Sequence, residues 1–358
     1  MKAQEAGDPS HYKILSAVEI ERLRKDLRVW YDSSRRDLPW RRTHDPYAIW
    51  ISEIMLQQTR VAAVIPYYER FLERFPDFHA LANTHDSELL SYWAGLGYYY
   101  RARNLQRAAQ QMRDAGSFPS TYGDIRRLPG IGEYTAAAIA SIAFNLPHAV
   151  VDGNVFRVLS RIFNDPTNIA SVNARKHFSA IADKLLDREQ PGVFNQAVME
   201  LGATLCLPKN PQCLLCPVSS ICRARRSGRE NDLPVKITAQ KNVREERVLF
   251  WVESGGKVLV WQRPPESRLM PGFWELPERE HLPGISIHRK LGSFRHGITF
   301  HNYRFEIVEA TVPDELGRCR WIHIEELGTI PMSTVLKKAS RMVAQSRTRH
   351  LKLDGEVG

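Results

Sequence analysis

Leu128-Pro-Gly-Ile-Gly-Glu-Tyr134 stands directly before a short segment, 134–144, that is almost entirely apolar. Its two glycines, Gly130 and Gly132, let backbone N–H groups come close to a bound phosphate, and the start of the following helix adds the positive end of its dipole. A lone Gly-x-Gly is more often an ordinary helix start with nothing bound. The stretch therefore predicts a turn leading into a helix, and its surroundings must decide whether that turn binds a phosphate.

Four cysteines gather further along the chain: Cys206, Cys213, Cys216 and Cys222. Four thiolates suit a structural zinc ion or an iron–sulfur cluster. Zinc ribbons usually carry two Cys-x-x-Cys pairs with a longer gap between them, whereas here one pair is flanked by two single cysteines. The spacing therefore favours a [4Fe–4S] cluster over zinc. Disulfide bonds are a third alternative, but nothing else in the chain is typical of a secreted protein.

The composition indicates a globular protein with a basic surface. The 358 residues are enough for about two domains, and 43% apolar residues support hydrophobic cores. The chain shows neither an N-terminal signal core nor an apolar run of membrane-spanning length, so we expect a cytoplasmic, nucleoid-associated protein without a membrane partner. The net charge of +10 favours a polyanion such as nucleic acid, although a merely basic soluble protein would share it.

The period of the apolar residues changes along the chain. Residues 16–230 predict a run of helices, and residues 223–246 are charged and without period, as in a linker. Beyond them the period approaches two, which indicates strands. The expected helices lie at 49–62, 67–75, 102–115, 134–144 and 333–345. The expected strands lie at 247–252, 257–262, 303–312 and 319–324, the first two joined by a hairpin at 253–256.

Two carboxylates stand out beside apolar residues. Asp152 ends the apolar run 150–151 against Gly153, where an Asp is often only the N-cap of the next helix. Glu53 lies close to the apolar stripe of the expected helix 49–62. If it is buried, its pKa is raised and it becomes a usable acid; the alternative is a solvent-facing side chain on the polar side of the helix.

Several stretches together closely resemble the adenine DNA glycosylases of the MutY type, which belong to the helix-hairpin-helix superfamily with endonuclease III. They cover roughly residues 20–225. In order, they are Leu38-Pro-Trp-Arg41, Ser52-Glu-Ile-Met-Leu-Gln-Gln-Thr59, Gly95-Leu-Gly-Tyr-Tyr99, the stretch 128–134, Val151-Asp-Gly-Asn-Val155 and the four cysteines. With the basic segment 102–115, this context favours the hairpin that holds a DNA backbone.

The resemblance implies a mainly α catalytic region at 1–228, with the [4Fe–4S] cluster loop at about 206–222. A linker at 229–243 and an α+β, Nudix-like domain at 244–350 would follow. The implied activity is removal of adenine mispaired with 8-oxoguanine, and also with guanine, in base excision repair. The implied partner is double-stranded DNA holding the 8-oxoguanine mispair. We expect a monomer.

The resemblance also implies roles for residues at the reacting centre. Glu53 would protonate adenine at N7, and Asp152 would stabilise or capture the oxocarbenium ion, which is the division of labour between the two carboxylates of a retaining glycosidase. Asn154 would orient Asp152, and Tyr134 would lie near the sugar. Bifunctional relatives carry a Schiff-base Lys where this chain has Tyr134, so we expect a monofunctional enzyme that leaves an abasic site.

Further residues are expected to contact DNA because of the same resemblance. Gln58 and Tyr98 would enter the duplex, Thr59 would lie near 8-oxoguanine, and the hairpin glycines would face a phosphate. The adenine pocket would be lined by Arg36, Arg41 and Gln196. Trp50 and Trp93 are expected to pack in the core instead. Around the cysteines, basic residues would meet DNA phosphates: Lys209, Arg223, Arg225 and Arg226.

The C-terminal region departs from a catalytic Nudix domain. The stretch 270–277 matches, but the Arg-Glu-x-x-Glu-Glu helix that binds Mg²⁺ in such enzymes does not follow it, which excludes nucleotide hydrolysis. We expect this domain to recognise 8-oxoguanine. Where the family often has Phe-Ser-His in a turn, this chain offers Phe294-Arg295-His296 or, as a second candidate, Thr299-Phe300-His301.

Two other functions are compatible with parts of this pattern. A thymine-mismatch glycosylase of the same superfamily shares the cluster and can also lack the lysine, but the motif around Glu53 and the C-terminal domain favour adenine. A non-catalytic iron–sulfur protein that binds DNA or senses redox state would not need Glu53 or Asp152.

Overall fold

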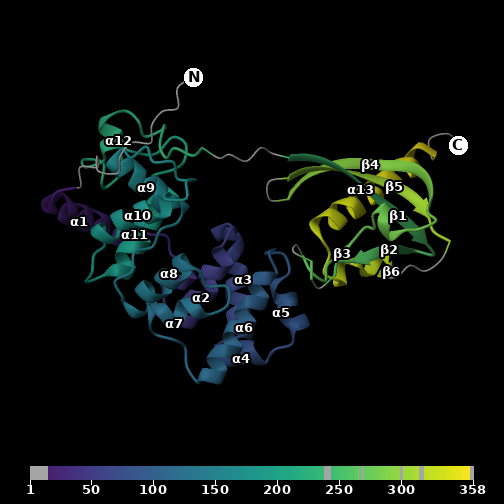
Figure 1. Ribbon diagram of the computed structural model, residues 1–358, viewed down its shortest axis with the longest axis horizontal. Coiled ribbons are helices and arrows are strands. Elements are labelled where there is room, and N and C mark those ends of the chain that lie inside the picture. Colours follow the sequence, from purple (N-terminus) through teal and green to yellow (C-terminus); the bar gives the residue numbers. More distant parts are fainter. Residues whose placement is uncertain are drawn as a thin grey trace. The chain divides into compact units, whose positions relative to one another are not determined.

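The computed structural model describes residues 15–237, 243–264, 266–267, 270–298, 301–313 and 318–354, with backbone alone at 346–354. The chain divides into two units, Met1–Thr238 and Ala239–Gly358. Helices make up the first unit, and a sheet with one long helix makes up the second (Figure 1). In the part of the chain that the structure describes, no helix combines the length and the apolar character that crossing a membrane requires.

The first unit is a succession of helices joined by short loops. Its elements are α1 (Ala17–Ser34), η2 (Pro39–Arg41), α2 (Pro46–Leu56), α3 (Val61–Arg74), α4 (Phe78–Asn83), α5 (Asp86–Trp93), α6 (Tyr100–Ala115), α7 (Tyr122–Arg127), α8 (Glu133–Phe144), α9 (Gly153–Phe163), α10 (Ala174–Leu185), α11 (Pro191–Thr204) and α12 (Arg223–Arg226). Local signals start several of them. Ser16 and Glu19 form a capping box at α1, and Asp45 caps α2, whose first residue is Pro46.

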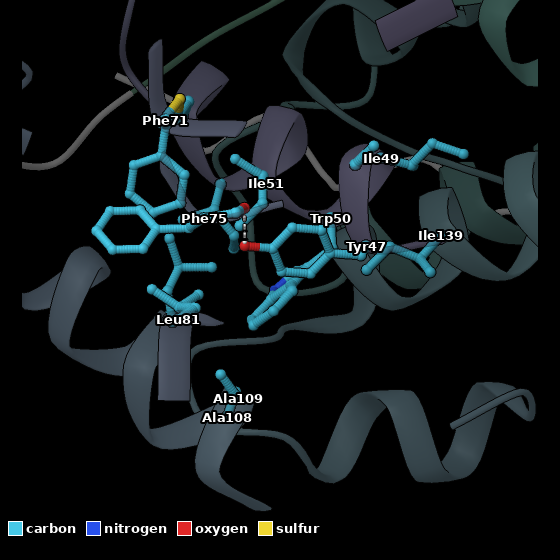
Figure 2. Packing of buried hydrophobic residues seen from close by; sticks show 14 of the residues in the cluster. Tyr47, Ile49, Trp50, Ile51, Phe71, Phe75, Leu81, Ala108, Ala109 and Ile139 are labelled. Atoms are coloured by element: carbon cyan, nitrogen blue, oxygen red, sulfur yellow. Dashed lines mark hydrogen bonds between the residues drawn. The ribbon is translucent and has the colours of Figure 1, made fainter. Parts of the chain in front are cut away.

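Two hydrophobic cores hold this unit together. One forms among η2 and α2 to α8, and the other among α1, α9, α10 and α11. Figure 2 shows part of the first core, where the Tyr47 hydroxyl donates to the Phe75 carbonyl at 2.9 Å. Trp50 and Trp93 are both fully buried, which confirms that they pack in the core. Helix α8, buried from Thr135 to Ser141, is the expected apolar core helix.

The expected helix 49–62 is instead the end of one helix and the start of another. Helix α2 ends at Leu56 and α3 begins at Val61. Between them Gln58 adopts a φ of +58°, which an α-helix cannot contain. The apolar stripe in the sequence continues across this break, and therefore the pattern alone hid it.

The connection between the units is shorter than the linker expected at 229–243. The Ile169 N–H donates to the Val235 carbonyl, and the Ile237 N–H donates to the Asn168 side chain. Leu233 is 1% exposed. Residues 229–237 therefore belong to the packing of the first unit. The sequence did not predict these backbone contacts, because residues 229–237 are charged and their apolar residues have no regular spacing.

The second unit is a mixed sheet with a helix on it, as the expected α+β class requires. Its elements are β1 (Val243–Ser254), β2 (Lys257–Gln262), β3 (Trp274–Glu275), η3 (Arg279–His281), β4 (Ser286–Ile298), β5 (His301–Thr311), β6 (Cys319–His323), η4 (Ile324–Thr329) and α13 (Thr334–Asp354). The strand order is β3-β2-β1-β5-β4, with β6 paired to β2. Strands β1 and β5 run parallel, and the other pairs are antiparallel. Side chains of α13, among them Leu336 and Ala339, form a core with the sheet.

The four expected strands are confirmed, and two strands, β3 and β4, were missed. The hairpin joins β1 to β2 through Gly255 and Gly256, both with positive φ, as a tight two-residue turn requires. Strand β4 was not expected, because its outward-facing polar residues and its bulges interrupt the apolar alternation.

Candidate active site

A cavity of about 250 Å³ opens between the two cores of the helical unit. Its wall brings together residues that are far apart in sequence, from η2, α2, the α2–α3 loop, α8, the start of α9 and α11. Residues expected at the site that line it are Arg36, Arg41, Glu53, Thr59, Tyr134, Asp152, Asn154 and Gln196. The helical fold therefore assembles one site from eight of the expected residues.

Glu53 is buried on α2, with only 7% of its surface exposed. Burial raises the pKa of this carboxyl to about 7, and the charge of Asp152 acts in the same direction. A hydrogen bond with Tyr134 and the charge of Arg41 act in the opposite direction but do not outweigh burial. The solvent-facing alternative is excluded, and near neutral pH this carboxyl is present in both protonated and ionised forms.

Tyr134 lies in the first turn of α8, directly after the hairpin turn. Burial raises the pKa of its phenol well above the usual range, and the carboxylates of Glu53 and Asp152 add to that rise. Its hydroxyl also lies 3.4 Å from the sulfur of Met199. Tyr134 is therefore a neutral hydroxyl at working pH, placed beside both acids.

Asp152 is both an N-cap and part of the cavity wall. Its Oδ1 accepts the Val155 N–H at 2.7 Å, which caps α9, and its Oδ2 accepts Asn154 Nδ2 at 3.1 Å. Burial raises the pKa of this carboxyl, and these hydrogen bonds oppose the rise. The two interpretations of Asp152 in the sequence are therefore compatible: the cap fixes the direction in which the carboxylate points.

Asn154 is held in turn by Arg157. The Arg157 Nη2 donates to Asn154 Oδ1 at 2.9 Å and to the Gly202 carbonyl at 2.7 Å, and its Nε donates to the Cys206 carbonyl at 2.7 Å. Since the oxygen of the Asn154 amide is thus engaged, its NH₂ group faces Asp152. A Cβ atom at Gly202 would lie 2.7 Å from the Asn154 Cβ, so α11 can pass α9 this closely only with glycine there.

Glu200 is a cavity residue that the sequence did not reveal. It is completely buried on α11 and accepts Arg36 Nε and Nη2 at 2.8 and 2.7 Å, and Arg41 Nη2 at 2.7 Å. Burial would raise its pKa, but the hydrogen bonds from the two arginines outweigh burial and lower the pKa to about 2. Glu200 therefore fixes two cations at the cavity wall. Its position four residues after Gln196, on the same helical face, was a usable signal.

Gln58 and Tyr98 are exposed rather than in the cavity. Both lie in loops, at positive φ angles of +58° and +49°. Half of the Tyr98 surface is exposed, and its ring packs edge-on against that of Tyr100 at 6.2 Å. Large side chains on left-handed backbone are uncommon, and they cluster at functional positions.

The hairpin turn between α7 and α8 has the expected backbone. Gly130 has a φ of +79°, and a Cβ there would lie 2.8 Å from the Asn104 Cβ. Gly132 is the N-cap of α8 and provides no side-chain cap. The first amides of α8 are thus left to a ligand or to water, which suits an anion.

The four expected metal ligands line one small cavity between α9, α11 and the loop that follows α11. Its wall contains Cys206, Cys213, Cys216 and Cys222 together with apolar residues such as Val158 and Leu201. Arg161 Nη1 lies 3.2 Å from the Cys206 sulfur. Within the described residues, no three His, Cys, Asp or Glu side chains are grouped as the ligands of a single metal ion would be. Four thiols around one enclosed space fit the donor set of an iron–sulfur cluster.

Phe294 and His296, expected in a turn that reads the lesion, lie on strand β4 of the second unit. His296 Nδ1 is 3.3 Å from Lys338 Nζ on α13, and the same ammonium lies 5.9 Å from the centre of the Phe294 ring. This is a correction: the two residues face a helix from a strand. Of the second candidate, Thr299 and Phe300 lie outside the described residues, and His301 begins β5.

The helical fold, the hairpin and the cavity with its buried carboxylates define a DNA glycosylase of the helix-hairpin-helix class. Residues 51–184 match the family model of the HhH-GPD superfamily of base excision DNA repair proteins. The adenine DNA glycosylase of Mus musculus is 33% identical over 94% of this chain and 81% of its own length, and that of Homo sapiens is 32% identical over 94% and 77%. The chain belongs to the adenine DNA glycosylases, which hydrolyse N-glycosyl bonds in base excision repair.

A solved structure supports the fold of the helical unit. The structure of a thermostable thymine-DNA glycosylase is 29% identical, has a TM-score of 0.54, and covers 59% of this chain and 98% of its own. The mammalian relatives, in contrast, extend over 94% of this chain, and so their similarity reaches the second unit as well.

Proposed function

We propose that the chain removes adenine mispaired with 8-oxoguanine, and with guanine, and leaves an abasic site. The observation that carries this proposal is the joint placement of Glu53 and Asp152 in one cavity, with Glu53 buried and its pKa raised to about 7. An adenine in a duplex cannot reach such a cavity, so the base has to leave the stack first.

The first chemical role falls to Glu53. In its protonated form it donates a proton to N7 of the extruded adenine, which makes the base a better leaving group. The bond between C1′ and N9 then breaks, its electron pair leaves with adenine, and the sugar becomes an oxocarbenium ion. A carboxyl with an ordinary pKa would be ionised at neutral pH and could not donate; a pKa of about 7 supports the role.

Asp152 provides the negative charge that the cation requires. Its carboxylate is directed by the Val155 N–H and by Asn154, so it needs no rearrangement when the positive charge appears at the sugar. It stabilises that cation or captures it at C1′, and water then attacks. Glu53, now ionised, accepts the proton from this water while the hydroxide bonds to C1′, which returns Glu53 to its protonated form and leaves Asp152 as a free carboxylate.

Tyr134 supports a monofunctional reaction. Schiff-base formation at the sugar carbon requires an amine nucleophile, which the bifunctional relatives supply with a lysine. Among the described residues that line the cavity there is no lysine, and Tyr134 stands where bifunctional relatives carry one. We therefore expect DNA strands that remain intact until alkali or heat is applied, and no adduct trapped by borohydride.

We also propose that the four thiols hold a [4Fe–4S] cluster. What supports this is their joint lining of one cavity with otherwise mostly apolar walls, beside the guanidinium of Arg161. Such a cluster would brace the loop after α11 and the short helix α12, whose exposed basic residues include Lys209 and Arg226, for contact with DNA phosphates. The reaction described above requires no electron transfer. Iron and sulfide analysis with visible absorption separates a cluster from zinc, and Cys319→Ser is the matched control for Cys216→Ser.

For the second unit we propose a Nudix-like domain that recognises 8-oxoguanine, within a protein that acts as a monomer. Phe294 lies half-buried on β4 beside the cation of Lys338, which is a position from which an aromatic ring and a charge could meet a damaged base. Phe294→Ala should lower the preference for adenine opposite 8-oxoguanine over adenine opposite guanine, with both rates measured under single-turnover conditions.

The decisive experiment for the whole proposal is single-turnover excision on three duplexes. They hold adenine opposite 8-oxoguanine, adenine opposite guanine, and thymine opposite guanine. We expect the first to react fastest and the third not at all. Glu53→Gln should abolish excision and retain DNA binding, whereas Glu73→Gln, an exposed carboxylate on α3, should change neither. Thymine release, or full activity of Glu53→Gln, would overturn the proposal.

A further inference from the structure

Arg101 is a buried cation outside the cavity. It lies in the first turn of α6 with 3% of its surface exposed. Its Nη1 donates to three carbonyl oxygens at the end of α2 and just beyond it: those of Ile54 at 2.7 Å, Met55 at 3.2 Å and Gln57 at 2.7 Å. The last carbonyls of a helix have no intrahelical partner, so this guanidinium caps α2 and opposes the negative end of its dipole.

The other nitrogen of the same guanidinium holds a second loop. Arg101 Nη2 donates to the carbonyls of Leu96 at 3.1 Å and Gly97 at 3.2 Å, in the loop between α5 and α6. It also reaches the Thr59 hydroxyl at 3.5 Å. One side chain thus ties the α2–α3 loop to the α5–α6 loop, although 40 residues separate Gln57 from Gly97 in the printed sequence.

Aromatic rings complete the surroundings of this guanidinium. Its carbon lies 5.3 Å from the centre of the Trp93 ring and 5.5 Å from that of Tyr98, both distances at which a cation is attracted to an aromatic face. The Trp93 indole N–H donates to the Gly97 carbonyl at 3.0 Å, so it holds the second loop at the same point.

The two loops that Arg101 joins are the ones that carry Gln58 and Tyr98. Gln58 follows the carbonyl of Gln57, and Tyr98 follows that of Gly97, so each exposed side chain comes directly after a residue that Arg101 holds. Both have left-handed backbone, which a large side chain adopts only when its surroundings impose it. Arg101 is the group that acts on both loops at once.

We propose that Arg101 is a positioning residue for base extrusion, which locks two loops so that Gln58 and Tyr98 enter the duplex together as a rigid wedge. The inference rests on the proposed function, because it takes these two side chains as the ones that enter DNA. Only a planar guanidinium with several fixed donors can hold both sets of carbonyls; a lysine ammonium carries the same charge but is a compact point donor.

The test uses the full-length chain in a Glu53→Gln background, so that extrusion is observed without excision. The probe is a duplex in which 2-aminopurine replaces the target adenine opposite 8-oxoguanine, because this fluorophore brightens when it leaves the stack. Fluorescence anisotropy of an end label gives DNA affinity in the same titration. We expect Arg101→Lys to lower the rate of the 2-aminopurine rise by about tenfold or more. Affinity, which phosphate contacts dominate, should stay within about threefold.

Two further variants separate a positioning role from a loss of folding. Arg113→Lys changes a partly exposed arginine at the far end of α6, whose contacts are with Asn83 and Asp114, and should leave extrusion unchanged. Gly97→Ala disturbs the second loop through its φ of +72° without touching the buried guanidinium, since no atom lies within 4 Å of the added Cβ. If Arg101→Lys does not fold, a slower fluorescence rise in folded Gly97→Ala still supports the lock, and an unchanged rise overturns it.

Alanine variants of Gln58 and Tyr98 distinguish the two ways in which the inference can fail. If both leave extrusion intact, the proposed role of these side chains is wrong, and so is the proposal that Arg101 locks their loops. If both slow extrusion but Arg101→Lys does not, only the lock is overturned. If the lock is correct, adding Tyr98→Ala to Arg101→Lys should cost much less than Tyr98→Ala alone, since both changes remove the same wedge.

Discussion

Two cavities of the helical unit share two helices but have opposite chemistry. Helix α9 begins at the cavity of Glu53, where Asp152 and Asn154 lie, and carries Val158 and Arg161 to the thiol cavity. Helix α11 likewise presents Glu200 to the first cavity, and Leu201 to the second. The first cavity surrounds its buried charges with partners from the protein itself, as the arginine pair on Glu200 illustrates.

The thiol cavity has less internal compensation, since Arg161 donates to Cys206 but burial outweighs the nearby arginines at Cys213. Burial raises the pKa of Cys213, of Cys222 and of Cys216, the last to about 12, so the protein alone leaves these thiols neutral at physiological pH. A positively charged inorganic group would reverse that preference. The difference teaches that the first cavity pairs its charges within the protein, whereas the thiols of the second are the ones for which we propose a positively charged cluster.

The largest effect is expected when the charge of Asp152 is removed from the cavity of Glu53. Asp152→Asn should lower single-turnover excision by about 10³-fold or more, since the oxocarbenium ion loses its counter-charge. Asn is as good an N-cap as Asp, so thermal stability should change little, whereas Asp152→Ala should also cost about 1 kcal/mol. Rapid-quench excision and thermal unfolding check both values. If Asp152→Asn excised adenine within tenfold of the parent rate, the role of Asp152 as counter-charge of the oxocarbenium ion would be refuted.

The second prediction concerns the thiol cavity, for which we propose a [4Fe–4S] cluster. Cys206→Ser should weaken binding to DNA by about tenfold or more, or lower the melting temperature, because an unbraced loop presents its basic residues poorly. The excision rate at saturating protein should fall less than the affinity. DNA affinity and single-turnover rates measured together decide this, with Cys319→Ser in the second unit as control. If the excision rate at saturating protein fell more than the DNA affinity, the thiol cavity would serve the chemical step as well as DNA binding, and the prediction would be wrong.

A third prediction concerns the side chain that joins the two cavities. Arg157→Lys keeps the charge but cannot hold Asn154, Gly202 and Cys206 at once. We expect about tenfold slower excision at saturating protein, because Asn154 is free to turn away from Asp152. Single-turnover kinetics at several protein concentrations would separate this loss from weaker binding. Arg188→Lys, which alters an exposed arginine, is the matched control.

The smallest effect is the dependence on pH. Glu53 must be protonated to act as an acid, and its pKa is raised to about 7, so excision should fall as pH rises through 7. For a single acid of that pKa, the rate at pH 8 should be about one fifth of the rate at pH 7. Asp152 must be ionised, and its pKa is raised too, so activity should also decline on the acid side. A rate that keeps rising up to pH 9 would exclude this role of Glu53.

Sequence reasoning singled out Glu53 amid apolar neighbours and Asp152 beside Gly153, but each residue alone had an ordinary alternative, and only the surrounding motifs implied a chemical role. Burial then decided between the alternatives for Glu53. Sequence reasoning did not find Glu200, whose one local signal is its spacing of four residues from Gln196, because its partners Arg36 and Arg41 meet it only in the folded chain.

Long-range pairing explains the other differences. Strand β4 escaped detection because bulges within residues 287–292 interrupt its register with β5. Phe294 lies on a strand rather than in a turn because it pairs with Phe305 of β5. The break between α2 and α3 was hidden because the loop containing Gln58 is held by Arg101, a residue of a later helix. Such contacts join residues that are distant in the chain, and local patterns cannot encode them.

The close passage of α11 over α9 has a consequence for naturally occurring variants. Gly202 has neither charge nor side-chain hydrogen bonds and does not line the cavity, yet the space it leaves empty is what lets Asn154 stay beside Asp152. A single added methyl group there would act on the chemistry through volume alone. Inherited substitutions that abolish repair therefore need not alter a catalytic carboxyl or a DNA contact. A position such as Gly202, which sequence comparison would class as structural packing, has to be tested by measuring activity.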